Sequence, residues 1–141
     1  MSYLNLKFPP RDIWLDKLYD YKEQFPKRSW GELWVKVLLE KNRIEFLEEV
    51  NLTLTNYTTG ETKNVRIDFY IPKLKTFIEY NGRQHYEPVP DFGGIRAFEK
   101  QQERDLWVKN ACNTNDHKLL EIPYYVCIEN SLKEVIELYN A

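Results

Sequence analysis

Two runs of alternating residues, separated by a connection of four residues, constrain the fold of this chain most strongly. Residues 65–71 alternate apolar and polar side chains, and residues 76–81 form the second run. A period of two is typical of a strand with one face in the core, and the short connection favours an antiparallel hairpin. A turn centred on that connection places Asp68 directly opposite Glu79. The sequence therefore predicts a hairpin that carries two acids on one face.

The rest of the chain mixes helical and strand patterns around this hairpin. Apolar residues at spacings of three and four predict helices over residues 12–25, 29–42 and 95–111, and from residue 131 onward. Ser29 and Ser131 each open a Ser-x-x-Glu capping box, which marks a helix N-terminus. Further strands are expected over residues 46–54 and 118–122. The expected fold class is α/β (mixed), with a central hairpin sheet flanked by helices and an added N-terminal helix.

Composition narrows the classes of protein further. The chain has 141 residues, 43% of them hydrophobic, which suits one domain with its own core. No apolar run reaches about 18 residues, so no membrane span is expected. Cys112 and Cys127 form no ligand cluster, so we expect buried thiols and no zinc. The net charge of -2 lacks the basic excess typical of nucleic-acid-binding domains, although a local groove can be positive on a nearly neutral protein.

The two facing acids point to a metal site. Like charges directly opposite on neighbouring strands, with Cβ atoms about 5 Å apart, are destabilising, and a divalent cation removes the repulsion. Asn81 lies two residues after Glu79 and shares its face. Two carboxylates and a carbonyl oxygen suit Mg²⁺. The alternative is an ordinary solvent-facing strand whose acids pair with basic neighbours, namely Arg66, Lys73 or Lys75.

The segment after the second acid adds a candidate base. Gln84 and His85 follow where the chain leaves the sheet edge, and working residues often lie at such positions. His85, one of two histidines, can act as a general base on water or as a neutral metal ligand. The alternative is a structural histidine that makes one hydrogen bond.

Two acids on predicted helices are further candidates. Glu32 closes the first capping box, so it is either a simple cap or a carboxylate in the first helical turn that faces the metal. Asp105 shares a helix face with Gln102 and Lys109. Asp105 is therefore either a site residue or half of a surface ion pair with Lys109.

With these residues in place, the chain resembles the PD-(D/E)XK nuclease superfamily. It is most similar to the subgroup of very-short-patch-repair-like enzymes and of phage homing endonucleases with an E-D-x-H-D pattern. The matching residues are Glu32, Asp68, His85 and Asp105, and the string Ile-Glu-Tyr-Asn-Gly-Arg-Gln-His-Tyr at 78–86 is the most specific piece. The resemblance covers residues 29–124 as a catalytic core, with an N-terminal helical extension (1–28) and a C-terminal helix (125–141) outside it.

The resemblance implies a restriction-endonuclease-like core and a metal-dependent endonuclease that hydrolyses DNA phosphodiester bonds. Mg²⁺ is the implied cofactor, with Mn²⁺ as a substitute. The implied catalytic residues are Glu32, Asp68, Glu79, Gln84, His85 and Asp105. The implied metal ligands are Asp68, Glu79 and Asn81, with His85 aiding water activation. Candidates for phosphate contacts are Arg83, Arg96, Lys100 and Lys109.

The chain departs from the family pattern at two positions. Ile67 stands where the family has proline before the first acid, and Asn81 replaces the lysine of (D/E)-x-K. Asparagine supplies no positive charge and no general base, so Gln84 or His85 must substitute. The alternative is a catalytically inactive nuclease-fold protein that binds nucleic acid or a protein partner.

The resemblance also implies a setting and leaves other choices open. It suggests the cytoplasm of a bacterial or phage-infected cell. One active site cuts one strand, so a double-strand break needs two nicks or a homodimer, for which Trp14, Trp30 and Trp34 are candidate contacts. The form of the nucleic acid stays open between duplex, single-stranded and branched DNA or RNA.

Overall fold

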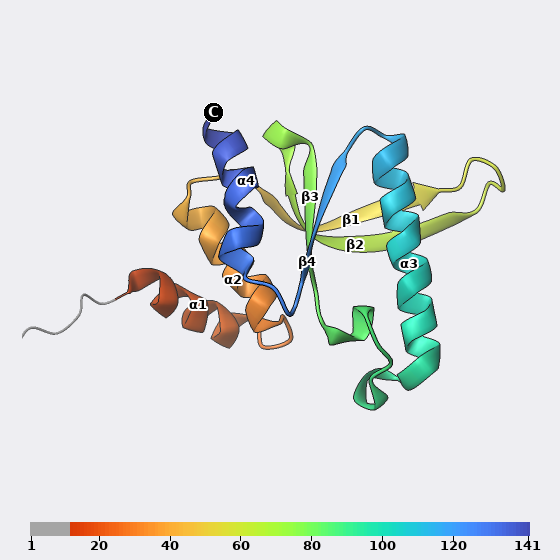
Figure 1. Cartoon of the computed structure of the whole chain (residues 1–141), viewed down its shortest axis with the longest axis horizontal. Coiled ribbons are helices and arrows are strands. Elements are labelled where there is room, and N and C mark those ends of the chain that lie inside the picture. The colour runs from red at the N-terminus through yellow and green to blue at the C-terminus, as the bar shows by residue number, and fades with distance from the viewer. Residues whose placement is uncertain (1–11) are drawn as a thin grey trace, which may run out of the picture.

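The protein is built around a four-stranded sheet in the order β1-β2-β3-β4 (Figure 1). A computed structural model describes residues 12–141, so residues 1–11 of the expected N-terminal extension lie outside the described residues. The strands are β1 (Leu47–Thr55), β2 (Thr62–Ile71), β3 (Thr76–Asn81) and β4 (Lys118–Pro123). The helices are α1 (Ile13–Gln24), α2 (Trp30–Lys41), α3 (Gly94–Thr114) and α4 (Ile128–Asn140). The mixed α/β class and the predicted order of elements are confirmed.

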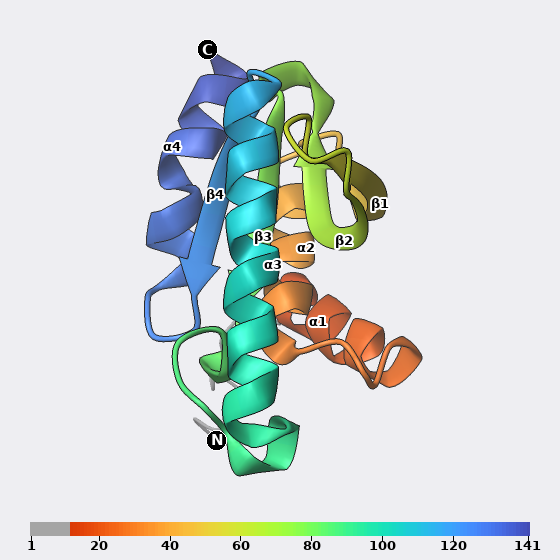
Figure 2. The ribbon, with the colours of Figure 1, turned by 90° about the vertical axis from the view of Figure 1, so that its right-hand side faces the viewer.

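Helices cover both faces of the sheet, which explains why the central strands are buried. Figure 2 shows α3 in front of the sheet, with α2 and α4 on the other side. On the α2 and α4 side, Leu39 and Leu132 pack with Phe69 and Ile78 of the hairpin. On the α3 side, a second cluster joins α3 to the sheet through residues that include Ile67, Phe77, Val108 and Cys112. Most residues of β3 are buried, as expected for a strand covered on both faces.

The central hairpin has the predicted register. Phe69 pairs with Ile78, and Ile71 pairs with Thr76, which places Asp68 across from Glu79. A single 3₁₀ turn over Pro72–Leu74 makes the connection. Strand β2 starts earlier than expected, because Thr62 already pairs with Thr55 across the turn to β1. β4 runs parallel to β3, so both strands end at the same edge of the sheet.

The two capping boxes have opposite outcomes. Ser29 caps α2 as predicted, since its Oγ accepts a hydrogen bond from the Glu32 amide at 3.1 Å. The prediction at Ser131 is wrong, because α4 already begins at Ile128 and the Ser131 hydroxyl donates to the Cys127 carbonyl one turn earlier. A Ser-x-x-Glu string occurs inside helices too, where a serine hydroxyl returns to its own backbone.

Three smaller expectations are also resolved. The long helix α3 continues to Thr114, past its predicted end at residue 111. Cys112 is buried as expected, whereas Cys127 is exposed and contradicts the expectation of two buried thiols. Within residues 12–141, no helix combines the length and apolarity needed to cross a membrane, in line with the sequence.

Candidate active site

An open cavity of about 610 Å³ lies where β2 and β3 separate, between the N-terminus of α2 and the middle of α3. It brings together residues that are far apart in the sequence. Its lining includes the predicted residues Glu32, Asp68, Glu79, Asn81, Gln84 and His85. Asp105 stands next to it in contact with His85. The E-D-x-H-D residues of the sequence therefore gather around one cavity.

The hairpin positions Asp68 by interrupting its own ladder. The last pair between β2 and β3 is Phe69 with Ile78, and the next amide of β3, that of Tyr80, donates to Asp68 Oδ2 at 2.8 Å. On the other side, Glu49 of β1 has a φ of 50°, a left-handed conformation that costs energy for a residue other than glycine. The ladder between β1 and β2 pairs Glu48 with Phe69 but leaves out Asp68. Asp68 is therefore left out of the ladder pairs that β2 makes with both of its neighbours, β1 and β3.

Asp68 and Glu32 form a buried carboxyl pair. Burial raises the pKa of Asp68 to about 8, helped by a hydrogen bond with Glu32 and by the negative charges of Glu32 and Glu79, against the lowering effect of the Tyr80 amide. A carboxyl group with this pKa is mostly protonated at neutral pH, so Asp68 keeps its proton beside Glu32.

Glu32 is more than a helix cap. Its backbone amide is bonded by Ser29, while its side chain turns into the cavity and accepts from Nε of Arg28. Arg28 is itself buried and also reaches Glu48 at 3.0 Å. Its Nη2 has no hydrogen-bond partner within the described chain. The Arg28 guanidinium therefore bonds more than one acid on the α2 side of the cavity.

Glu79 has a different environment from Asp68. Only 4% of Glu79 is exposed, and both of its carboxylate oxygens accept from Arg104 of α3, at 2.9 and 3.3 Å. This fork geometry is the strongest arrangement for an arginine and a carboxylate. The two acids that face each other on the hairpin are therefore compensated in opposite ways, since Glu79 pairs with a cation and Asp68 keeps its proton.

The sequence analysis missed Arg104 because the face of α3 that it defined carried Gln102, Asp105 and Lys109 and did not include Arg104. The buried residues of this helix are Val108 and Cys112, and the positions three or four residues before Val108 are Arg104 and Asp105. The apolar pair was the signal that could have identified Arg104.

His85 and Asp105 form a hydrogen-bonded pair across the cavity. His85 Nδ1 lies 3.0 Å from Asp105 Oδ2, and Gln101 donates to the other oxygen of Asp105 at 2.9 Å. Burial acts to raise the pKa of Asp105, but the bonds from His85 and Gln101 and the charge of Arg104 outweigh it, so this pKa lies below its usual value. The contact at Nδ1 leaves Nε2 of His85 for the cavity. The alternative of an Asp105–Lys109 surface pair is wrong, since Lys109 contacts Glu121 at 3.4 Å.

Asn81 offers an oxygen with no partner. Its side chain is 2% exposed, and its Oδ1 is buried without a hydrogen bond among residues 12–141. Its amide nitrogen donates to the Tyr86 hydroxyl at 3.3 Å. A buried oxygen without a donor is the kind of group that a cation satisfies.

The possible metal ligands in the cavity are all oxygen atoms, which suit a hard divalent cation. Within residues 12–141, no three His, Cys, Asp or Glu side chains form a group that can hold a metal ion. Glu32 and Asp68 provide two carboxyl groups, and the Asn81 amide provides a third oxygen. Mg²⁺ is commonly held by one or two carboxylates together with water and substrate oxygens. The residues present therefore fit such an ion.

The predicted phosphate contacts lie outside the cavity lining. Arg83 is exposed and pairs with Glu87, Lys109 pairs with Glu121, and Arg96 and Lys100 are exposed on α3. The basic residues that do line the cavity are Lys22, Lys27, Arg28, Arg66 and Arg104.

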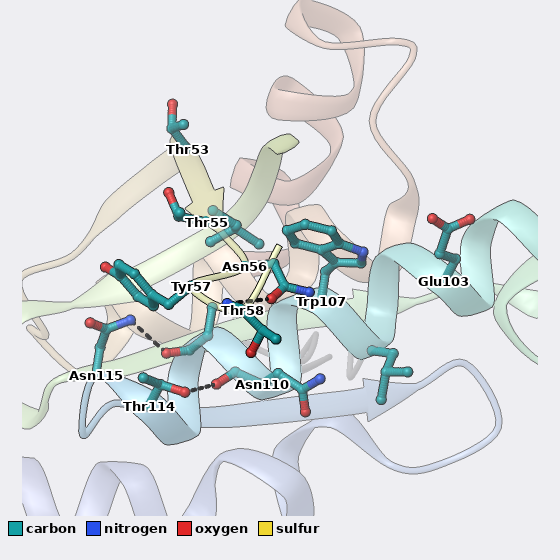
Figure 3. A pocket seen from close by; sticks show the side chains of 13 residues that line it. Thr53, Thr55, Asn56, Tyr57, Thr58, Glu103, Trp107, Asn110, Thr114 and Asn115 are labelled. Carbon is teal, nitrogen blue, oxygen red and sulfur yellow. Dashed lines mark hydrogen bonds between the residues drawn. The ribbon is translucent and has the colours of Figure 1, made fainter. Parts of the chain in front are cut away.

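A second cavity of about 610 Å³ lies between the tip of the β1–β2 hairpin and α3 (Figure 3). Threonine and asparagine side chains surround it together with Trp107 and Tyr57. Glu103 is the one acid or base in its lining. It therefore lacks the paired acids and the histidine that acid–base chemistry requires.

Comparison with known proteins shows that the chain is similar to several uncharacterized viral proteins. It is 37% identical over 121 residues to the uncharacterized protein 094L of Frog virus 3, which covers 83% of this chain and 77% of the relative. The chain belongs to the same family as 094L. No family model matches it, and no solved structure matches it.

Two further viral relatives are longer than the part they share with this chain. Uncharacterized protein 033L of Invertebrate iridescent virus 3 is 33% identical over 128 residues, 82% of this chain and 64% of the relative. Uncharacterized protein 307L of Invertebrate iridescent virus 6 is 48% identical over 64 residues, 45% of this chain and 32% of the relative.

Proposed function

We propose that this protein is a metal-dependent endonuclease of the PD-(D/E)XK type that hydrolyses phosphodiester bonds of DNA. The observation that carries the proposal is the placement of the Glu32–Asp68 carboxyl pair and the His85–Asp105 pair around one open cavity. Cation-binding oxygens beside an oriented imidazole are the groups that metal-assisted hydrolysis needs. The viral relatives support an infected cell as the setting.

Glu32, Asp68 and Oδ1 of Asn81 would hold the ion. A bound Mg²⁺ supplies polarisation of a phosphoryl oxygen and a lower pKa for a coordinated water. Asp68 must then give up its proton, so this carboxyl group would exchange a proton for a cation. Glu79, the other predicted ligand, accepts from Arg104 through both of its oxygens, so we assign it to the support of the site. Only Oε2 of Glu32 accepts from Arg28, which leaves its other oxygen for the ion.

His85 would accept the proton of the attacking water. Asp105 fixes Nδ1 and so leaves Nε2 as the acceptor, and it stabilises the imidazolium that forms. Gln84 lines the same cavity and can orient the water or a phosphate oxygen. Arg28 and Arg66 would contact the DNA backbone, which supplies affinity without sequence preference.

A second candidate function is binding of nucleic acid without cleavage. The Glu79–Arg104 pair favours it, because this pair occupies the acid that the family pattern couples to a lysine, and Asn81 stands at the lysine position. The raised pKa of Asp68 beside Glu32 opposes it, since a binder has no need for a buried acid pair that destabilises the fold.

Cleavage of supercoiled plasmid and branched DNA with Mg²⁺ or Mn²⁺ tests the proposal. We expect cutting by the wild type and none by Asp68→Asn. Glu103→Gln is the matched control, because Glu103 lies in α3 beside the second cavity. Binding without cutting on every substrate would support the second candidate, and equal cutting by Asp68→Asn would exclude the proposed site.

A further inference from the structure

Three tyrosines form an exposed cluster beside the candidate active site. Tyr86, Tyr124 and Tyr125, here called the tyrosine patch, lie with ring centroids 5.3 to 6.1 Å apart. Their exposed fractions are 39%, 42% and 66%. Two of the three contacts are edge-to-face, so the rings support one another in fixed orientations.

The patch is joined to the cavity through the ends of β3 and β4. The Tyr86 hydroxyl accepts from Asn81, and the Tyr124 amide donates to the Asn81 carbonyl at 2.8 Å. Because these two strands are parallel, their final residues Asn81 and Pro123 lie side by side, at the lower end of the sheet in Figure 1. The patch therefore adjoins the oxygen that we assign to the metal.

The exposure of these rings has a cost that stability alone does not explain. Large aromatic side chains gain free energy by burial, and a contiguous exposed group commonly marks a binding surface. Tyr57, at the hairpin tip, is 80% exposed and shows by contrast what an isolated surface tyrosine looks like. A ligand that bound over the tyrosine patch would bury these exposed rings.

We propose that the tyrosine patch stacks unpaired nucleobases, so that the substrate is single-stranded or locally unpaired DNA. This inference rests on the proposed function, because it places the bases next to the phosphate to be cut. Aromatic rings beside a backbone-binding cavity bind single strands without sequence preference. In an intact duplex the bases are already stacked on each other, so the patch would gain little from it.

Features around the patch favour a nucleic acid over a protein partner. The cavity that the patch adjoins is lined by several cationic side chains, which suit a polyanionic backbone. Arg83 lies near Tyr124, close enough to interact with it electrostatically. A DNA strand that ran from the cavity across the tyrosine patch would contact the cationic side chains first and the tyrosine rings next.

Binding measured without a divalent cation tests this inference apart from catalysis. Fluorescence anisotropy would compare labelled oligothymidine with a duplex of equal length, in EDTA, for the wild type and for the double variant Tyr124→Ala/Tyr125→Ala. We expect the double variant to weaken single-strand binding by about tenfold or more and duplex binding far less. Tyr124→Phe/Tyr125→Phe should retain binding, and Tyr57→Ala is the matched control. Cross-linking of an oligonucleotide with 5-iodo-2′-deoxyuridine should label the patch in the wild-type protein.

The outcomes separate the two proposals. Tyrosine-dependent single-strand binding without any cleavage would support stacking while the nuclease proposal fails. Cleavage that needs Asp68 but is unaffected by the tyrosine variants, with cross-links elsewhere, would overturn stacking and leave the nuclease proposal intact. Absence of DNA binding by the wild type would also overturn stacking and would favour a protein partner on the patch.

Discussion

The α3 side and the α2 side of the cavity treat buried acids differently. On the α3 side, Arg104 bonds both oxygens of Glu79 and also reaches Asp105, which His85 bonds as well, so each carboxylate has a cationic partner. On the α2 side, Arg28 bonds Glu32 and Glu48, and Asp68 is left with a proton and one backbone amide. The acids on the α3 side are therefore already compensated. Asp68 on the α2 side is not, which is why we propose that the metal binds there.

Removal of the acid on the α2 side should have the largest effect. Asp68→Asn is expected to reduce DNA cleavage by about a thousandfold or more, because a metal ligand stabilises the transition state by several kcal/mol. The protein should still fold, because the side-chain oxygen of the asparagine can still accept the hydrogen bond from the Tyr80 amide. The substitution also removes no salt bridge among the described residues. Single-turnover cleavage with saturating Mn²⁺ measures the loss. Activity within a few-fold of the wild type would show that the α2 side holds no catalytic metal.

Loss of the cation on the α3 side should instead reduce stability. Arg104→Ala leaves Glu79 buried and unpaired, which costs about 3 kcal/mol of unfolding free energy. Lys109→Ala is the control, because its contact with Glu121 is half exposed and is worth less than about 1 kcal/mol. Urea unfolding of both variants gives the comparison. Equal, small losses would mean that Glu79 is not held by Arg104 in solution.

The imidazole on the α3 side should contribute to catalysis but not to metal binding. His85→Ala is expected to lower the cleavage rate by about a hundredfold, the range for a general base. Mn²⁺ affinity should stay unchanged, as measured by calorimetry. Asp105→Asn should lower the rate less and alter its pH profile, because it changes only the partner of Nδ1. A loss of metal affinity in His85→Ala would make the histidine a ligand.

The proton on Asp68 should make stability fall as pH rises. The raised pKa of about 8 keeps Asp68 protonated in the folded protein, whereas the unfolded chain releases this proton near the ordinary value of 3.8. The folded state binds more protons between these values, so this group lowers the unfolding free energy by at most about 1.4 kcal/mol per pH unit from about pH 4 to pH 8. Urea unfolding across this range should show the slope in the wild type. The slope should flatten in Asp68→Asn, and a flat wild-type profile would mean that the pKa of Asp68 is not raised in the folded protein.

The hairpin and its acids were predictable because local rules decide them. A four-residue connection between alternating strands fixes the register, and the register fixed Asp68 across from Glu79. The cap at Ser29 was predictable for the same reason, since its partner is three residues away. Glu32, His85 and Asp105 were candidates from their positions and also match the E-D-x-H-D resemblance, and the fold gathers them at one cavity.

The residues that compensate charge were not predictable. Arg28 and Arg104 owe their roles to contacts between elements that only the folded chain creates. Arg28 lies just before α2 and Arg104 lies in the middle of α3, and both stand among other charged residues, as the predicted phosphate contacts do. The opening of the ladder at Asp68 also depends on both neighbouring strands at once. Short-range patterns therefore locate the acids but not the arginines that determine which acid is left without a cationic partner.

The most direct test of the account is the effect of Mn²⁺ on thermal unfolding at pH 8. At this pH Asp68 is losing its proton, so a cation that binds Glu32 and Asp68 should raise the melting temperature in a saturable way. The account predicts a rise for the wild type and for Glu103→Gln, and none for Asp68→Asn. An equal rise in Asp68→Asn, or none in the wild type, would contradict the assignment of the metal to the α2 side.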